Sequence, residues 1–168
     1  MKTLILAAAL TAAPALAALA DAPGITVTDA YARSTNPRSG AVFMTVANAN
    51  AADCRITAAT ADVTPRAELH THAEENGMMK MTPVEAVTIP AGGTHALERG
   101  GDHVMLMALE TPLKDGDKVA LTLDLGACGT LPVEAVVDNK RPASGHAGGH
   151  AGGHAGGHAG HTTPMPAN

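Results

Sequence analysis

The chain has 168 residues, a net charge of −5 and only two aromatic residues, Tyr31 and Phe43. With so few rings for base stacking and an excess of acidic side chains, this composition argues against binding to nucleic acid or to an anionic lipid surface. Its 9 histidines and 8 methionines are in excess, and imidazole and thioether groups both bind metals. The length predicts one folded domain.

The first 20 residues have the features of a secretory signal peptide. Lys2 supplies a positive start, residues 4–10 form an apolar run, and Ala18-Leu19-Ala20 is a small-x-small cleavage site. The run is shorter than the roughly 20 apolar residues of a membrane-spanning helix, and Pro14 interrupts the segment. No cysteine stands at the junction, so we expect cleavage after Ala20, export to the periplasm, and a soluble mature protein without stable membrane insertion.

Residues 21–140 are predicted to form an all-β domain. Apolar and polar side chains alternate along residues 119–125 and 131–137, which is the period of a half-buried strand, and no long stretch has the period of an amphipathic helix. Turn residues such as Asn76-Gly77 and Asp115-Gly116 separate the segments. Further strands are expected at residues 25–32, 41–47, 55–59, 66–71, 78–82, 87–89, 94–97 and 103–109. This many short strands indicates a Greek-key barrel or a β-sandwich.

Two cysteines lie within this predicted domain. Export would place Cys54 and Cys128 in an oxidising compartment, where an even pair favours one disulfide. Two separate buried thiols are the alternative. The spacing does not match a short redox or zinc pair, so neither cysteine is assigned to a metal site.

Three of the predicted strands carry metal donors at every second position, which places the donors of one strand on one face. The first two strands are joined by a short connection and should form a hairpin. A thioether is a poor ligand for Mg²⁺, Ca²⁺ or Zn²⁺, whereas Cu(I) favours soft sulfur together with imidazole. For any single methionine, and for Met79 and Met107 in particular, core packing is the alternative. The donors, strand by strand, are His70 and His72, then Met79 and Met81, then His103, Met105 and Met107.

Residues 141–168 are expected to form a disordered tail. Beyond Arg141 the tail has no Asp, Glu, Lys or Arg, and its histidines are separated by Ala-Gly-Gly or Ala-Gly spacers. Such flexible spacing lets several imidazoles converge on one ion, and nitrogen donors bind Cu(II) most tightly among the common divalent metals. A merely solubilising terminus is the alternative. The tail histidines are His146, His150, His154, His158 and His161.

Four of the donors have the spacing of a known family. His70 is followed after ten residues by Met81, and Met81 after twenty-one residues by His103-Val104-Met105. This spacing resembles the signature of the PCuAC periplasmic copper chaperones, and the resemblance extends over about residues 24–137. It implies a cupredoxin-like fold of the Greek-key barrel or sandwich type. It also implies one Cu(I) ion near the surface, bound by these four residues. His72, Met79 and Met107 would then lie beside the ligands and exclude water.

The resemblance further implies a function. The protein would carry Cu(I) and supply it for assembly of the CuA site of cytochrome c oxidase, acting on the CuA domain of subunit II directly or together with a Sco-type thiol protein. The tail would capture Cu(II) and raise the copper concentration near the folded site. A periplasmic copper buffer or resistance protein without a specific acceptor is the alternative. No hydrolase, zinc-protease or phosphate-loop motif occurs in the sequence, and we do not expect an enzyme.

Overall fold

A computed structural model describes residues 22–75 and 77–142 of the chain. The predicted signal peptide and the five tail histidines lie outside the described residues. No helix among the described residues has the length and apolar character needed to cross a membrane. The described segments are strands joined by turns, with one short 3-10 helix. The prediction of an all-β domain is therefore confirmed.

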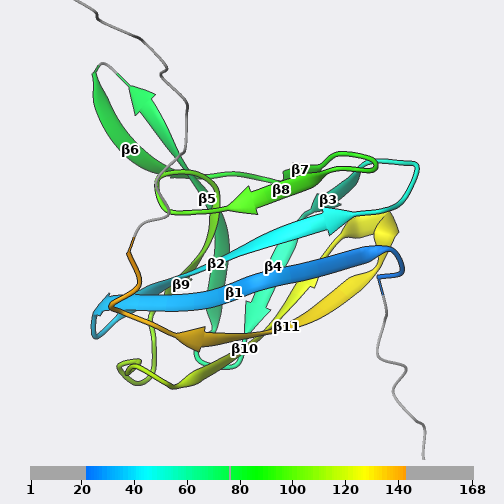
Figure 1. Ribbon diagram of the computed structural model, residues 1–168. Helices are drawn as coiled ribbons and strands as arrows, with labels where there is room; N and C mark the ends of the chain where they lie inside the picture. The colour runs from blue at the N-terminus through cyan, green and yellow to red at the C-terminus, as the bar shows by residue number, and fades with distance from the viewer. Residues whose placement is uncertain (1–21, 76, 143–168) are drawn as a thin grey trace, which may run out of the picture.

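The strands follow one another along the chain with short connections (Figure 1). Ten strands were predicted, and each is present, although several bounds differ. The elements are β1 (Ile25–Asn36), β2 (Ser39–Asn48), β3 (Cys54–Ile56), β4 (Ala58–Ala61), β5 (Arg66–Glu75), β6 (Met78–Pro83), β7 (Val87–Ile89), β8 (Thr94–Leu97), β9 (His103–Met107), β10 (Lys118–Asp124), the 3-10 helix η1 (Gly126–Cys128) and β11 (Thr130–Val137).

Two predicted strand boundaries are wrong for identifiable reasons. The segment predicted at residues 55–59 is two strands, because the chain changes partner at Thr57: β3 pairs with β7, whereas β4 pairs with β10. The strand predicted at residues 103–109 ends at Met107, because Ala108 has a φ of 57°. That conformation lies outside the β region, and β2 and β5 both pair with β9 only as far as Met107.

The main sheet has the hydrogen-bonded order β4-β10-β11-β1-β2-β9-β5-β6, and β8 also pairs with β2. The first half of β2 pairs with β9 and the second half with β8. Within the part of the chain that is described, this order ends at β4 and β6 and does not close on itself. Consequently β5 and β6 form a hairpin at one end of the sheet, and this hairpin projects from the body of the molecule (Figure 1).

The core is aliphatic, as the shortage of aromatic residues requires. Alternate residues of β10 are buried, and β11 repeats the pattern over most of its length. Among the described methionines, only Met44 belongs to the core. The largest fully buried apolar side chains are Ile56, Ile89, Leu97, Leu106, Leu123 and Leu125. The other described methionines are therefore not needed to fill the core.

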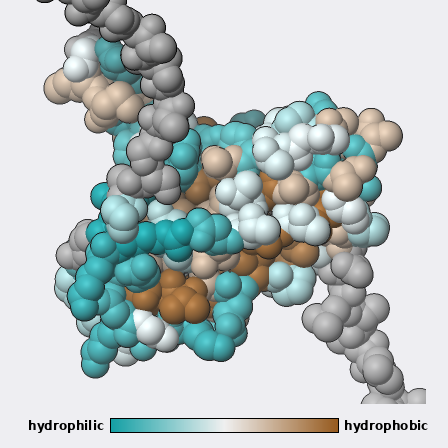
Figure 2. Space-filling model, viewed as in Figure 1, coloured by the Kyte–Doolittle hydropathy of each residue, from teal (hydrophilic) through white to brown (hydrophobic). Residues whose placement is uncertain are grey.

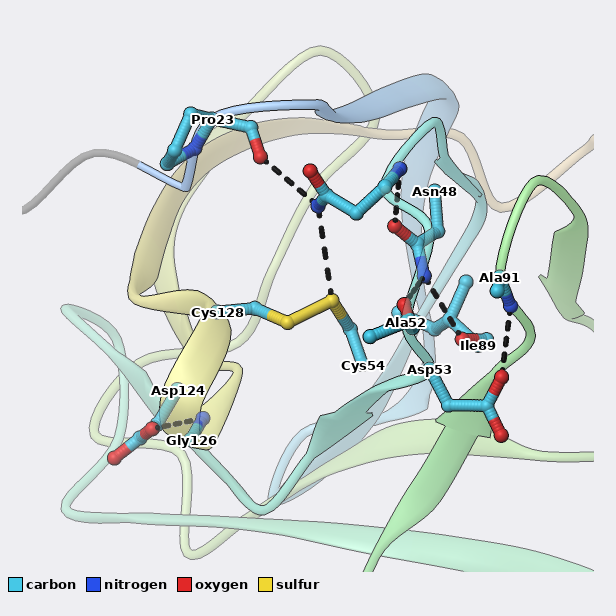
Figure 3. The surroundings of a disulfide bond; sticks show 11 residues. Pro23, Asn48, Ala52, Asp53, Cys54, Ile89, Ala91, Asp124, Gly126 and Cys128 are labelled. Atoms are coloured by element: carbon cyan, nitrogen blue, oxygen red, sulfur yellow. Dashed lines mark hydrogen bonds between the residues drawn. A yellow bond between two sulfur atoms is a disulfide. The ribbon is translucent and has the colours of Figure 1, made fainter.

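A disulfide joins Cys54 of β3 to Cys128 of η1 (Figure 3). Cys54 is 1% exposed and belongs to the core. Nearby, the side-chain amide of Asn48 donates to the carbonyl oxygens of Ala52 and Ile89 at 2.9 and 3.2 Å. The bond ties together the end of the molecule that lies away from the β5–β6 hairpin (Figure 1).

Replacing both cysteines with alanine should lower the free energy of unfolding. The two residues are 74 positions apart, and a cross-link over a loop of that length stabilises by about 4 kcal/mol through the entropy of the unfolded chain. Urea unfolding of the parent and of the double variant measures the difference. The parent should lose the same stability on adding a reductant, to which the variant is insensitive. Equal midpoints for all samples would show that the bond contributes nothing.

Candidate metal centre

The predicted donors lie on β9, β5 and β6, which are neighbours in the sheet. In the antiparallel register, His70 of β5 is opposite His103 of β9, and His72 of β5 is opposite Met81 of β6. The predicted hairpin is confirmed, and Gly77 in its turn has a φ of 76°, a conformation that glycine adopts without strain. Residues from distant parts of the sequence are thus brought to one face.

The pattern of buried apolar residues shows on which face of the sheet the donors lie. Val104 and Leu106 of β9 and Leu69 of β5 are buried in the core. Because side chains alternate along a strand, His103 and Met105 point to the opposite face of the sheet. His70 and His72 share that face with them for the same reason.

His103 has a ring nitrogen that is free to bind a metal ion. The side chain is 1% exposed, and the ring nitrogen Nδ1 donates to the carbonyl oxygen of Gly101 at 3.0 Å. This bond leaves the lone pair on Nε2, which is buried and has no hydrogen-bond partner. Burial lowers the pKa of His103 below its ordinary value of 6.5, with the Gly101 bond acting in the opposite direction. His103 is therefore a neutral imidazole, the form that binds metals.

His70 is held by a carboxylate. The ring is 8% exposed, and its Nε2 donates to Oε2 of Glu68 at 3.0 Å. Glu68 also accepts from Nε of Arg66 at 2.7 Å, and the hydrogen bonds from His70 and Arg66 lower the pKa of Glu68. Nδ1 of His70 is buried without a partner. A carboxylate on one ring nitrogen orients the other, as it does for many metal-binding histidines.

The two methionines of the predicted set share a hollow on this face. A depression of about 330 Å³ is lined by Met81, Met105 and Phe43, among other residues. A neighbouring one of about 430 Å³ is lined by Met81, Phe43, His72 and His103. Because Met81 and Phe43 line both, the two neighbouring hollows are together called the donor pocket below. Met81 is 45% exposed, so the pocket is open to solvent.

The three residues that were predicted to lie beside the ligands differ in their positions. His72 lines the donor pocket, whereas Met79 and Met107 are not among its lining residues. Met79 is opposite Glu74 and 61% exposed, and Met107 is opposite Arg66 and half-buried. Figure 2 shows apolar surface on the projecting hairpin, which carries Met79. Neither methionine fills the core, the alternative considered above.

Several pocket residues escaped the sequence analysis. Phe43 of β2 lies with its ring 5.9 Å from that of His103, and Arg99, which precedes β9, lines both parts of the pocket. Arg33 of β1 lines one part and donates from Nη2 to the carbonyl oxygen of Asn139 at 2.7 Å. No local pattern marks these residues, because each is brought to the site by long-range strand pairing.

The chemistry of the donor set is selective. Among the described residues, no three His, Cys, Asp or Glu side chains come together in a group able to hold a metal ion. An ion bound in the donor pocket would therefore take sulfur from Met81 or Met105 in addition to imidazole nitrogen. Such a mixed set suits Cu(I) and disfavours hard cations.

The tail begins beside this pocket. The guanidinium of Arg141 lies over the ring of Tyr31 at 4.1 Å and forms a salt bridge with Asp29. Its carbonyl oxygen accepts a hydrogen bond of 3.4 Å from Arg99, a pocket residue. His146 is five residues further along, within about 18 Å of this anchor for an extended chain.

One known family and one relative match most of this chain in sequence. Residues 25–137 match the family described as "Putative lipoprotein LpqE-like". "Putative lipoprotein Lxx21020" of Leifsonia xyli subsp. xyli is 32% identical over 117 residues, which are 69% of this chain and 70% of that protein.

Two solved structures are similar in fold. The Cu(I) form of DR1885 from Deinococcus radiodurans is 37% identical, with 71% of this chain and 83% of that chain covered at a TM-score of 0.52. The copper-bound PCuAC domain of PmoF2 is 17% identical, with 68% and 92% covered at a TM-score of 0.57. The similarity to PmoF2 supports the fold, and the Cu(I) form of DR1885 is the more closely related of these two chains.

Proposed function

Since this chain belongs to the LpqE-like family and has the fold of PCuAC domains, we propose that it is a periplasmic copper chaperone. The observation that carries the proposal is the unpartnered, buried Nε2 of His103 at a pocket lined by thioethers. A relative 37% identical was solved in a Cu(I) form. The proposed Cu(I) ligands are His70, Met81, His103 and Met105.

This donor set suits a protein that passes its metal on. Thioether and imidazole are neutral ligands, so they hold Cu(I) without the strong charge attraction of a thiolate. Because Met81 is 45% exposed, an incoming ligand has access to the ion from the solvent side. An acceptor with thiolate ligands can then take Cu(I) by stepwise ligand exchange within a transient complex.

The proposed acceptor is the CuA domain of subunit II of cytochrome c oxidase, reached directly or through a Sco-type thiol protein. The tail has a separate role in the proposal: its five histidines capture Cu(II). Arg141 fixes the root of the tail beside Arg99 of the pocket, so captured copper stays near the folded site. A copper buffer or resistance protein would use the same ligands but no specific acceptor.

The first prediction concerns Met105. Met105→Leu preserves the volume of the side chain and removes its sulfur, so Cu(I) affinity should fall by about tenfold or more, or about 1.4 kcal/mol. Competition with a chromogenic Cu(I) chelator measures the affinity, and X-ray absorption counts the sulfur ligands. Met79→Leu is the matched control, because Met79 lies outside the pocket, and it should bind as the parent does. Unchanged affinity in Met105→Leu would remove that residue from the ligand set.

The second prediction distinguishes a chaperone from a buffer. The Cu(I)-loaded protein, mixed with an apo CuA domain, should transfer copper faster than a small-molecule Cu(I) chelate that supplies the same free copper concentration. The protein provides a docked complex, whereas the chelate only dissociates. Copper bound to the separated CuA domain is the readout. Equal rates for the two donors would favour the buffer.

The third prediction concerns the tail. Replacing its five histidines with asparagine in the full chain should remove at least one equivalent of bound Cu(II) and leave Cu(I) binding unchanged. In the parent, this Cu(II) should be released as the pH falls below about 6.5, because protonated imidazole does not bind metal. Titration followed by electron paramagnetic resonance (EPR) gives the stoichiometry. An unchanged Cu(II) stoichiometry would contradict the capture role.

A further inference from the structure

We propose that Arg33 and Arg99 make the donor pocket selective for the charge of an incoming ligand, so that Cu(I) is released to anionic thiols in preference to cationic ones. The inference rests on the proposed chaperone function and specifies the chemistry of the group that removes the ion. Both arginines line the hollow of about 330 Å³ that Met81 and Met105 also line, and Arg99 lines the neighbouring hollow as well.

The charge of the two arginines is not neutralised by their hydrogen bonds. Arg33 donates from Nη2 to the carbonyl oxygen of Asn139, and its Nε is buried without a hydrogen-bond partner. Arg99 donates from Nη1 to the carbonyl oxygen of Arg141. A carbonyl oxygen has no net charge, so these bonds leave both guanidinium groups positive at the pocket.

No carboxylate opposes the two arginines within the pocket. Neither Asp nor Glu is among the described residues that line its two hollows. The pocket is thus a positive region on a chain whose net charge is −5. Carboxylates of other segments are bonded to other basic side chains: Asp29 to Arg141, Glu68 to Arg66 and Asp102 to His95.

Tyr31 lies beside the same concentration of positive charge. Burial raises the pKa of its hydroxyl above the ordinary value of 10.0, and three arginines oppose this shift, in decreasing order Arg141, Arg99 and Arg33. Because Arg33 and Arg99 act on one hydroxyl group, their fields overlap there. Arg99 is also exposed, so a ligand that arrives from the solvent meets its charge.

The exchange of Cu(I) with a thiol brings negative charge into this region. The thiol loses its proton to water, its sulfur forms a bond to Cu(I), and the bond from copper to the thioether of Met81 or Met105 breaks. Copper remains Cu(I) throughout, so no electron is transferred. Two guanidinium groups beside the ion attract an anionic ligand and raise its rate of arrival, and they have the opposite effect on a cationic one.

Two small thiols of similar size and opposite charge test this selectivity. They are 2-mercaptoethanesulfonate, which has a sulfonate group, and cysteamine, which has an ammonium group. Each is mixed at low ionic strength with the full chain, whose five tail histidines are replaced by asparagine and which is loaded with one equivalent of Cu(I). The ultraviolet absorption of the Cu(I)–thiolate bond gives the exchange rate, and the ratio of the anionic to the cationic rate is compared between variants.

The ratio should fall by about threefold or more in Arg99→Gln, and by about tenfold or more in Arg33→Gln/Arg99→Gln. At an ionic strength of about 1 M, screening should bring the ratio of the parent close to that of the double variant. Arg99→Lys preserves the charge and should keep the ratio within about twofold of the parent, a result that a role in packing alone would not produce.

Arg55→Gln is the matched control, because it removes the same charge from an exposed position of β3 outside the pocket and should leave the ratio unchanged. Competition with a chromogenic Cu(I) chelator should show no loss of Cu(I) affinity in any variant, since none removes a donor. Equal ratios in the parent, Arg99→Gln and the double variant would overturn the inference and leave the proposed function standing. If the parent binds no Cu(I) in its folded domain, the proposed function fails and this inference fails with it.

Discussion

The antiparallel register of β6, β5 and β9 is the constraint on which the donor pocket depends. It aligns His70 with His103 and His72 with Met81. Burial of Leu69 and Leu106 in the core holds this register, because a slip of one residue would turn the apolar side chains outward and the metal donors inward. The same alternation thus stabilises the fold and positions the candidate donors.

The groups around the pocket combine neutral donors with positive charge. His103 is buried and hydrogen-bonded so that a lone pair remains free, and Glu68 holds a ring nitrogen of His70. Arg33 and Arg99 line the pocket and contribute positive charge. A monovalent copper ion bound by neutral donors adds less charge to this surface than a divalent ion would. The positive charge around the pocket consequently favours a monovalent ion over a divalent one.

Much of the fold could be predicted from local sequence patterns. Alternation of apolar and polar residues located the strands, with β3 and β4 predicted as a single strand, and Asn76-Gly77 located the hairpin turn. The partner exchange at Thr57 and the left-handed Ala108 could not be predicted, because each depends on packing between distant segments. The spacing motif associates His70 with Met81, but in the structure the residue directly opposite Met81 is His72. Register between strands is a property of three-dimensional pairing, which spacing alone does not contain.

The position of the disulfide has a consequence for reactions with thiols. An acceptor that offers thiolates to copper is also a reagent that can cleave disulfides. Cys54 is buried, and β3, the strand to which it belongs, lies in the body of the molecule away from the tip of the projecting β5–β6 hairpin (Figure 1). A thiolate that docks at the pocket therefore meets the metal and not the sulfur–sulfur bond. Because the thioethers of the pocket and the disulfide lie apart, the protein would keep its disulfide through repeated encounters with thiol-bearing partners.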